Sequence, residues 1–418
     1  MELGFGKKTV YYDASKPNII GVLECSKKND IKPLKEILEK SMLGPIGKPR
    51  LKELLQKNKP QDLVVIVSDI TRSIADYDKI LSFLAAEIID AGIDEKNVEF
   101  MVALGTHRKH TPEENKTLFG DLLSDFNFSF HDCHKDLMTI GKTSSGLEVQ
   151  VNKRVKAADF VIATGRINFH YLAGFSGGRK SILPGIASYE TIRSNHCKLK
   201  REGVAPGKIE SNIIAQEMAE AAELFKVDYL MNIIEDDEKH VMSAFCGDIV
   251  HAHKKGIERF KAEHMSRITS QADCVIVSAG GYPKDRTLFN SHKVLNNIAS
   301  AVRRGGSIIL VAECSDGMGN PEFVNYMLDN NIEELLHYPE AKIEIGGHRA
   351  FQTSKLLKDY KVYIVSELDS SLMSQMNFTP VKDIESAVDQ AKKDYGQGLK
   401  IYIVPDGRSI VTTLNDRC

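Results

Sequence analysis

The segment DLVVIVSD, residues 62–69, contains five consecutive apolar residues between polar ends. A strand that is apolar on both faces is typical of a buried parallel sheet, because helices cover both sides of such a sheet. Helix-type patterns separate several of these strands, at 77–92, 292–305 and 351–360. The sequence therefore predicts an α/β fold in which helices connect parallel strands. Similar strand-like runs occur at 18–25, 98–105, 159–165, 273–281, 307–314, 361–368 and 400–405.

The length of the chain predicts more than one domain. It has 418 residues, of which 42% are hydrophobic, and a single core rarely grows to that size. A charged and polar stretch at 261–273 is the expected boundary. We expect two domains, residues 1–268 and 269–418, each with a largely parallel sheet flanked by helices. The last ~20 residues could return to the N-terminal domain, since chain ends often lie close together.

The composition argues against several classes of protein. Lys plus Arg (55) nearly balance Asp plus Glu (57), so no overall field favours nucleic acid or an anionic membrane. Seven scattered cysteines without a CxxC pair argue against disulfides and structural zinc. The N-terminus MELGFGKKTVYYD lacks a signal-peptide core, and no apolar run reaches the ~20 residues that span a bilayer. We expect a cytoplasmic protein with no nucleic-acid or membrane partner.

The segments that follow four predicted strands hold most of the chemically distinctive residues. In α/β sheets, ligands bind at the carboxyl ends of the strands, where the loops meet. We therefore expect the active site to lie at these ends, in the cleft between the two domains. The segments are SDITRS (68–73), GTHRKHTPEE (105–114), GRINFHYLAGFSGGRKS (165–181) and GGYPKDRTLFNSHK (280–293).

Two histidines in these segments, His107 and His170, are candidates for a general acid/base pair, because imidazole titrates near neutral pH. The alternative is that each caps a helix or lies in solvent. Arg72 and Lys293 are candidates for binding an anion, although either could be a solvated surface charge. Asp69 ends an apolar strand, and it either supports the site or caps the following turn.

The segment HYLAGFSGGRKSILPG, residues 170–185, resembles a phosphate-binding loop in part. The GxxxxGK[ST] spacing from Gly174 fits Lys180, but Arg179 occupies the position of the second glycine. Pro184 falls where the helix of such a loop would continue. Because Arg179 is a neighbouring cation, it favours the neutral, nucleophilic form of Lys180. Covalent attachment of a cofactor to Lys180 is therefore chemically reasonable.

Histidine-containing segments elsewhere offer incomplete metal sites. His196 could ligate a transition metal through either ring nitrogen, but one histidine alone does not bind a metal tightly. The alternative is a packed or exposed histidine on a helix. Neither the cluster at 131–134 nor the pair His251 and His253 offers a full ligand set, and we interpret both as structural.

The motifs SDITR, GTHR, HYLAGFSGGRKSILPG, SNH and GGYPKD, in this order over nearly the whole chain, resemble the nickel-dependent lactate racemase family. Enzymes of that family carry a nickel-pincer nucleotide, which is pyridinium-3,5-bisthiocarboxylic acid mononucleotide joined to a lysine by a thioamide. A carbon and two sulfurs of the cofactor bind nickel together with one histidine. The resemblance implies that Lys180 is the tether and His196 the nickel ligand, with Gly177 and Gly178 near the phosphate of the nucleotide.

The resemblance also implies a reaction, the racemisation or epimerisation of 2-hydroxy carboxylic acids. His107 and His170 match the catalytic histidines of the family. One removes the proton of the substrate hydroxyl while hydride leaves the alpha carbon for the cofactor, and hydride then returns to either face. Arg72 and Lys293 match substrate-binding residues, and Asp69 supports the site near the cofactor. The expected partners are a small 2-hydroxy acid and, transiently, the cofactor-maturation enzymes, without which the chain would lack nickel and nucleotide.

The sequence departs from the family pattern near the expected substrate tail. Phe289 and Asn290 stand where the family has Tyr and Gln, and the chain contains no tryptophan. The substrate is therefore lactate or a larger 2-hydroxy acid, with Asn290 as a substrate-binding residue. Two alternatives from other classes are a non-catalytic nucleotide or organic-anion binding protein of the same fold, and a phosphotransferase with a phosphate-binding loop. The sequence predicts no oligomeric state.

Overall fold

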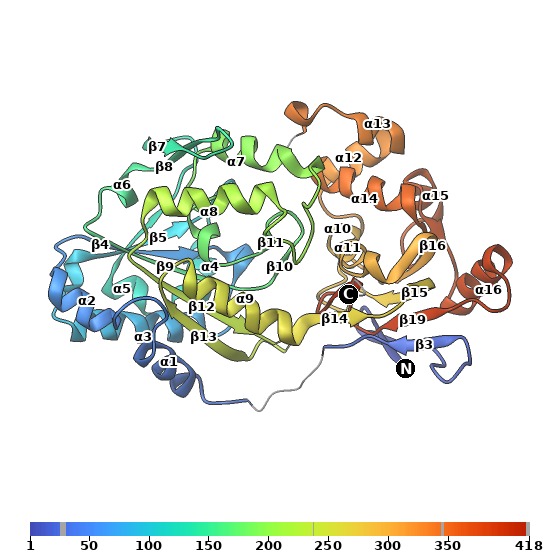
Figure 1. Cartoon of the computed structure of the whole chain (residues 1–418), viewed down its shortest axis with the longest axis horizontal. Helices are drawn as coiled ribbons and strands as arrows, with labels where there is room; N and C mark the ends of the chain where they lie inside the picture. The colour runs from blue at the N-terminus through green and yellow to red at the C-terminus, as the bar shows by residue number, and fades with distance from the viewer. Residues whose placement is uncertain (26–30, 237, 344–346, 415–418) are drawn as a thin grey trace. The chain divides into compact units, whose positions relative to one another are not determined.

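The structure is a computed structural model that describes residues 1–25, 31–236, 238–343 and 347–414 (Figure 1). It divides into two compact units. The central unit comprises Lys28–Ala262, and the terminal unit comprises Met1–Lys27 together with Glu263–Cys418. Among the described residues, we find no helix with the length and apolarity needed to cross a bilayer.

The central unit is built on a six-stranded sheet with the order β13-β12-β9-β4-β5-β6. All neighbouring strands are parallel except β12 and β13. The apolar residues of β4 are 0–1% exposed, as expected for a strand covered on both faces. The strands are β4 (Leu63–Ser68), β5 (Val98–Ala103), β6 (Asn127–Phe130), β9 (Phe160–Arg166), β12 (Tyr229–Glu235) and β13 (Val241–Gly247).

Helices cover this sheet because their apolar faces pack on alternate residues of its strands. Leu63, Val65 and Val67 of β4 share one core with the first four helices of the unit, as the two-residue period of a strand requires. These helices are α1 (Leu34–Leu43), α2 (Leu51–Asn58), α3 (Tyr77–Asp90) and α4 (Pro112–Phe119). The remaining helices of the unit are α5 (Leu122–Asp125), α6 (Lys153–Lys156), α7 (Tyr189–His196), α8 (Ile213–Phe225) and α9 (His251–His264).

Short elements complete the central unit. Two hairpins pair β7 (Leu137–Lys142) with β8 (Glu148–Asn152) and β10 (Phe169–His170) with β11 (Gly174–Phe175). The 3-10 turns are η1 (Ile70–Arg72), η2 (Glu95–Asn97), η3 (Gly178–Ser181) and η4 (Cys197–Lys200).

The terminal unit has a six-stranded, fully parallel sheet with the order β18-β17-β16-β15-β19-β3. Its strands are β3 (Ile19–Val22), β15 (Ala272–Ser278), β16 (Val302–Val311), β17 (Lys361–Val365), β18 (Thr379–Pro380) and β19 (Ile401–Val404). The helices are α10 (Leu288–Ser291), α11 (Lys293–Ile298), α12 (Pro321–Asp329), α13 (Ile332–His337), α14 (Gly347–Asp359), α15 (Ser370–Gln375) and α16 (Ile384–Tyr395), with η5 (Ala299–Ala301) and η6 (Glu340–Lys342).

The predicted α/β class is confirmed, and each of the eight predicted strands overlaps an observed one. The predicted helix 292–305 is wrong at its end, because β16 begins at Val302 and pairs there with Ala272. The strand β12 was not predicted, since Asn232 interrupts its apolar pattern.

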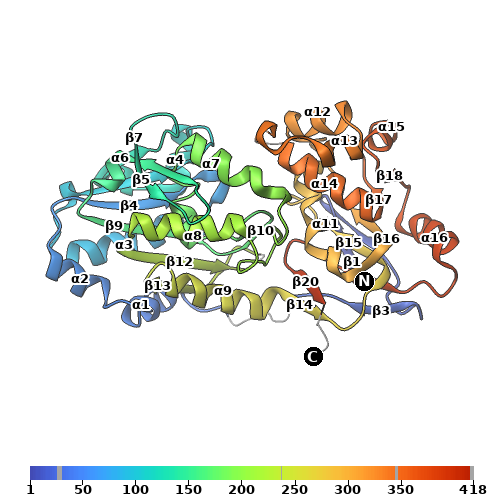
Figure 2. The ribbon, with the colours of Figure 1, turned by 45° about the horizontal axis from the view of Figure 1, so that its top comes forward.

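The compact units differ from the expected domains at the start of the chain. Residues 1–25 belong to the terminal unit, because β3 pairs with β19 (Figure 1) and the hairpin of β1 (Glu2–Phe5) and β2 (Lys8–Tyr11) joins its core. Figure 2 shows β20 (Val411–Leu414) beside β14 (Met265–Ile268), with which it pairs in the same unit. The last four residues of the final segment lie outside the described residues.

We predict that Leu3→Ala destabilises the terminal unit. Leu3 is fully buried against Ile276 and Ile309, so the truncation leaves a cavity that costs about 2–5 kcal/mol. Amide hydrogen exchange should accelerate in β15 and β19. Tyr11→Ala is the control, since Tyr11 is 70% exposed in the same hairpin. Acceleration confined to β4 and β9 would contradict the assignment of the N-terminal hairpin to the terminal unit.

Candidate active site

The carboxyl ends of three neighbouring strands carry most of the predicted residues of the central unit. Asp69 follows β4, His107 follows β5, and the segment with His170 and Lys180 follows β9. Because β4 pairs in parallel with both β5 and β9, these ends lie at one edge of the sheet. The fold therefore gathers side chains that are far apart in the sequence.

Asp69 and His107 form a hydrogen-bonded pair. The Nδ1–H of His107 donates to Oδ2 of Asp69 at 2.6 Å, and the hydroxyl of Thr71 donates to the same carboxylate at 2.9 Å. The aspartate side chain does not cap the 3-10 turn η1, which was its alternative role. Asp69 is 2% exposed and His107 39% exposed, so a buried carboxylate orients an exposed imidazole. This arrangement leaves Nε2 of His107 as the proton acceptor.

The Asp69 carboxyl remains ionised although it is buried. Burial by itself raises the pKa of this carboxyl, but the hydrogen bond and charge of His107, and the charge of Arg72, bring the pKa below its ordinary value. Arg72 is itself exposed at the end of η1, where its guanidinium also donates to the carbonyl of Thr71 at 3.2 Å. The guanidinium of Arg72 therefore lies close to the Asp69–His107 pair.

His170 is held by the backbone rather than by a carboxylate. Its Nδ1 accepts hydrogen bonds from the backbone N–H groups of Ala173 at 3.1 Å and Leu172 at 3.3 Å. A nitrogen that accepts cannot carry a proton, so the neutral ring carries its hydrogen on Nε2. That Nε2 lies 3.1 Å from Nζ of Lys180. Both histidines therefore present Nε2 to their surroundings.

Lys180 lies in the 3-10 turn η3, in a positively charged environment. Burial lowers the pKa of its ammonium well below the ordinary value, and the charges of Arg72 and Arg179 lower that pKa further, while Asp69 opposes them. The effect of Arg179 agrees with the prediction made from its position next to the lysine. A lysine with a depressed pKa is a nucleophile at neutral pH.

Gly177 and Gly178 are required by packing within the protein. A Cβ on Gly177 would lie 2.8 Å from Oδ1 of Asn232, and one on Gly178 would lie 2.4 Å from the ring of His253. The same Asn232 accepts a hydrogen bond from the backbone N–H of Gly178 at 2.9 Å. The two glycines thus let the turn that carries Lys180 lie directly on β12 and α9.

Buried polar residues behind η3 fix the position of Arg179. Its guanidinium donates to the carbonyl of Ala173 at 2.9 Å and contacts Nδ1 of His253 at 3.3 Å. Nε2 of His253 donates to the carbonyl of Ser176 at 2.9 Å. Burial, with the charge of Arg179, lowers the pKa of His253 to about 3, so this imidazole is neutral. The interpretation of His253 as structural agrees with these contacts.

The geometry of a phosphate-binding loop is absent around Lys180. In such loops an α-helix begins at the lysine, so that its N-terminal N–H groups face the phosphates. Here η3 ends at Ser181 and the next helix, α7, begins only at Tyr189. The phosphotransferase alternative loses its structural basis.

The remaining predicted residues lie elsewhere in the fold. His196 is the last residue of α7 in the central unit and is partly buried. Lys293 begins α11 in the terminal unit, and its Nζ lies 3.4 Å from Oδ1 of Asn290 at the end of α10. Among the described residues, no group of three or more His, Cys, Asp or Glu side chains could hold a metal ion.

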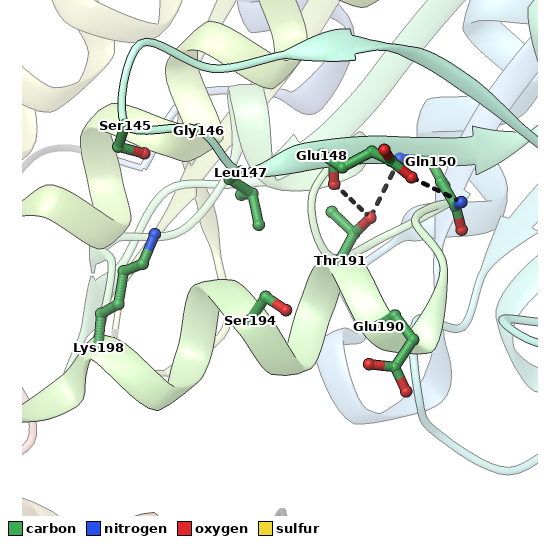
Figure 3. A pocket seen from close by; sticks show the side chains of 9 residues that line it. All are labelled: Ser145, Gly146, Leu147, Glu148, Gln150, Glu190, Thr191, Ser194 and Lys198. Carbon is green, nitrogen blue, oxygen red and sulfur yellow. Dashed lines mark hydrogen bonds between the residues drawn. The ribbon is translucent and has the colours of Figure 1, made fainter. Parts of the chain in front are cut away.

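A surface hollow of about 420 Å³ lies between the β7–β8 hairpin and α7 (Figure 3). Its α7 side includes Glu190, Thr191 and Ser194, and Lys198 of η4 also lines it. None of the predicted site residues lines this hollow. It is therefore a feature separate from the cluster at the carboxyl edge of the sheet.

Sequence reasoning missed residues that position the site. Nε2 of His110 accepts a hydrogen bond from the backbone N–H of Ile70 at 2.9 Å, which ties the segment after β5 to η1. Asn232 supports Gly178 from β12. A polar residue inside the apolar run YLMNIIE, residues 229–235, was the available signal for Asn232.

We predict that Asp69→Asn lowers the free energy of unfolding by about 1.5–3 kcal/mol at neutral pH, because a buried charge-assisted hydrogen bond is lost. The folded pKa of Asp69 is lowered, so its contribution is complete above the unfolded value near 3.9 and disappears as pH falls below it. The difference between the unaltered protein and the variant, measured by denaturant unfolding, should shrink in acid. Asp125→Asn, at an exposed carboxylate, is the control. A difference that does not change with pH would refute the charge pairing.

We predict that Gly178→Ala costs more than Gly92→Ala. Both glycines have positive φ, +50° and +91°, so both variants incur about 1–2 kcal/mol of backbone strain. Only Gly178 has a side chain within 4 Å of the added Cβ, which adds about 1–3 kcal/mol of overpacking against His253. Chemical denaturation of the two variants measures the difference. Equal losses of stability would contradict the contact with His253.

Comparison with known proteins points to the same family as the sequence motifs. Residues 5–205 match the lactate racemase N-terminal domain, and residues 268–412 match the lactate racemase C-terminal domain. The chain is 32% identical over 425 residues to the lactate racemase of Thermoanaerobacterium thermosaccharolyticum, covering 98% of each protein. It is 30% identical over 424 residues to that of Lactiplantibacillus plantarum, covering 98% of this chain and 99% of that protein.

Solved structures agree with these matches. The lactate racemase apoprotein of T. thermosaccharolyticum superposes with a TM-score of 0.91 at 31% identity, over 99% of both chains. A protein from Thermotoga maritima shares the fold with a TM-score of 0.61 at 17% identity, over 89% of this chain and 100% of that one. The chain belongs to the lactate racemase family, a family of isomerases.

Proposed function

We propose that the protein racemises or epimerises 2-hydroxy carboxylic acids with a nickel-pincer nucleotide tethered to Lys180. One observation carries this proposal. Two imidazoles, each fixed through Nδ1, lie at the same edge of the central sheet as a lysine whose pKa is strongly lowered. This arrangement supplies two proton-transfer groups and one nucleophilic amine, which are the groups that such an enzyme needs from its own chain.

The residues present fit the cofactor. Attachment through a thioamide requires an unprotonated lysine, and the environment of Lys180 favours that form. His196 at the end of α7 would supply one nickel ligand, and the remaining ligands would come from the cofactor. When bound, the group would accept hydride from the alpha carbon of the substrate and return it. Gly177 and Gly178 would let the backbone come close to the nucleotide, while the backbone N–H of Gly178 donates to Asn232.

The two histidines would exchange protons with the substrate hydroxyl through Nε2. In His107, Asp69 holds the proton on Nδ1, so that Nε2 accepts the hydroxyl proton and the carboxylate stabilises the resulting imidazolium. In His170, two backbone N–H groups occupy Nδ1, so that its proton exchange also runs through Nε2. Histidines on the two sides of a planar 2-oxo acid would allow the oxygen to be reprotonated in either configuration.

Substrate binding is assigned to cations and to the residues that depart from the family pattern. Arg72 would bind the carboxylate of the substrate, since a guanidinium matches its two oxygens. Lys293 and Asn290 would be the contacts from the terminal unit. The relatives named lactate racemase suggest lactate as the reference substrate. Phe289 and Asn290 favour a 2-hydroxy acid with a longer tail, because they change the part of the family pattern that lies near that tail.

The protein would act in the cytoplasm, where cofactor-maturation enzymes would load it. We expect that co-expression with these enzymes gives a mass increase located at Lys180, about one nickel per chain, and loss of optical purity in at least one 2-hydroxy acid. Lys180→Ala should abolish the mass increase and lower the rate at least about 100-fold, since the hydride acceptor is then absent.

Lys57→Ala, which removes an exposed lysine of α2, is the matched control and should retain cofactor and activity. Intact mass, metal analysis and chiral chromatography are the measurements. An unmodified, metal-free chain under conditions that mature an active relative would overturn the proposal. It would then favour a binding protein of the same fold.

A further inference from the structure

The contact between His170 and Lys180 determines the protonation of both side chains. Nδ1 of His170 accepts from the backbone N–H groups of Ala173 and Leu172, so Nδ1 carries no hydrogen. The neutral ring must then carry its hydrogen on Nε2, which is 3.1 Å from Nζ of Lys180. An ammonium has three donor hydrogens and no lone pair, so it could not accept from Nε2–H. Lys180 is therefore the acceptor, which requires a neutral amine.

The charged groups around Lys180 also favour its neutral amine. Arg72 and Arg179 both disfavour the ammonium, and Asp69 is the carboxylate that opposes them. That carboxylate is already engaged with the Nδ1–H of His107 and the hydroxyl of Thr71. An ammonium on Lys180 would also point a hydrogen at the Nε2–H of His170, and the two hydrogens would repel each other. Geometry and electrostatics therefore agree on the neutral amine.

We propose that His170 is a positioning residue for cofactor attachment, in addition to its role in catalysis. It donates Nε2–H to the lone pair of Lys180 in the cofactor-free protein, and so holds the amine neutral and in a fixed orientation. This inference rests on the proposed function, because it presumes that Lys180 receives a cofactor. It adds that the chain itself prepares the nucleophile before any maturation enzyme arrives.

Attachment would also release His170. A thioamide nitrogen donates its hydrogen and is a poor acceptor, since its lone pair is delocalised. Once the tether forms, Nε2–H of His170 therefore loses its acceptor on Lys180. The same Nε2–H then becomes available to a substrate oxygen. Cofactor attachment thus changes the hydrogen-bond acceptor of His170 from Lys180 to the substrate.

Competitive acetylation of the cofactor-free protein with limiting acetic anhydride tests the protonation of Lys180. In this reaction the amine nitrogen forms a bond to a carbonyl carbon, acetate leaves with the bonding electrons, and the buffer takes the proton. Peptide mass spectrometry reports labelling at Lys180 between about pH 6 and pH 12, with an ordinary lysine pKa near 10.4 as the reference. Labelling of Lys180 should level off at a lower pH than that of an ordinary lysine. A profile that levels off near the ordinary value would overturn the proposal.

Two variants distinguish the effect of this hydrogen bond on Lys180 from the effect of the other groups around Lys180. His170→Leu cannot donate and should lower labelling at about pH 8 several-fold, because one hydrogen bond to the neutral form is lost. His170→Gln can donate from its side-chain amide and should retain labelling and cofactor loading, although racemisation is lost in both variants. Labelling of exposed Lys57 controls for reagent and folding. Equal labelling in His170→Leu and the unaltered protein would contradict the role of His170.

A measurement on the unaltered chain keeps the test independent of folding in the variants. ¹⁵N NMR of histidine-labelled, cofactor-free protein should show His170 with a protonated Nε2 and an unprotonated Nδ1, assigned by the signal lost in His170→Gln. A protonated Nδ1 would refute the proposal. Failure of the proposed function is distinct, because it appears as a correct labelling profile without any cofactor on Lys180. A loaded cofactor with an ordinary labelling profile would refute only this inference.

Discussion

The parallel pairing of β4 with β5 and β9 is the constraint on which the site depends. It ends three buried strands at one edge of the sheet, and each end carries reactive side chains. Because those strands are 0–4% exposed along most of their length, their ends cannot shift relative to one another without disturbing the core. The short distance between Asp69 and His107 is a consequence of that rigidity, since the two residues belong to segments after different strands.

The two histidines are held by different means, and this difference has chemical consequences. A carboxylate behind His107 stabilises a positive ring, as in catalytic triads. Backbone N–H groups behind His170 do the opposite, because they require an unprotonated Nδ1. The site is therefore asymmetric in the cofactor-free chain. His107 is arranged to take a proton, whereas His170 is arranged to give one from Nε2.

The strands and the class of fold could be predicted from the sequence because local apolar runs report burial directly. The segment 62–69 is one example, and its apolar residues 63–67 are buried as expected. The site was predictable in part, since loops after strands are where ligands bind in α/β sheets. The pairing of Asp69 with His107 was not, because it depends on the lateral order of β4 and β5. Sequence patterns also gave no signal that β3 would pair with β19, since strand partners distant in sequence leave no local trace.

Packing in the folded structure also explains the roles of residues that sequence motifs did not predict. Gly178 lies in a segment that resembles a phosphate-binding loop in part, yet in the structure its missing side chain makes room for His253. The lowered pKa of Lys180 was foreseen from Arg179, but the charge of Arg72 adds to it through tertiary structure. The effect of a charged residue next to Lys180 in the sequence, such as Arg179, can be predicted from the sequence. The contribution of Arg72, from the segment after a different strand, appears only once the sheet is formed.

The central claim is that the chain racemises 2-hydroxy acids by moving hydride from the alpha carbon and returning it within the site. Its most direct test uses one enantiomer of a substrate carrying deuterium at the alpha carbon, incubated in ordinary water with cofactor-loaded protein. Hydride transfer predicts that the opposite enantiomer retains deuterium at that carbon, because the hydrogen never enters solvent. Replacement of the deuterium by solvent hydrogen in the product would indicate removal of a proton from the alpha carbon, and it would contradict the account.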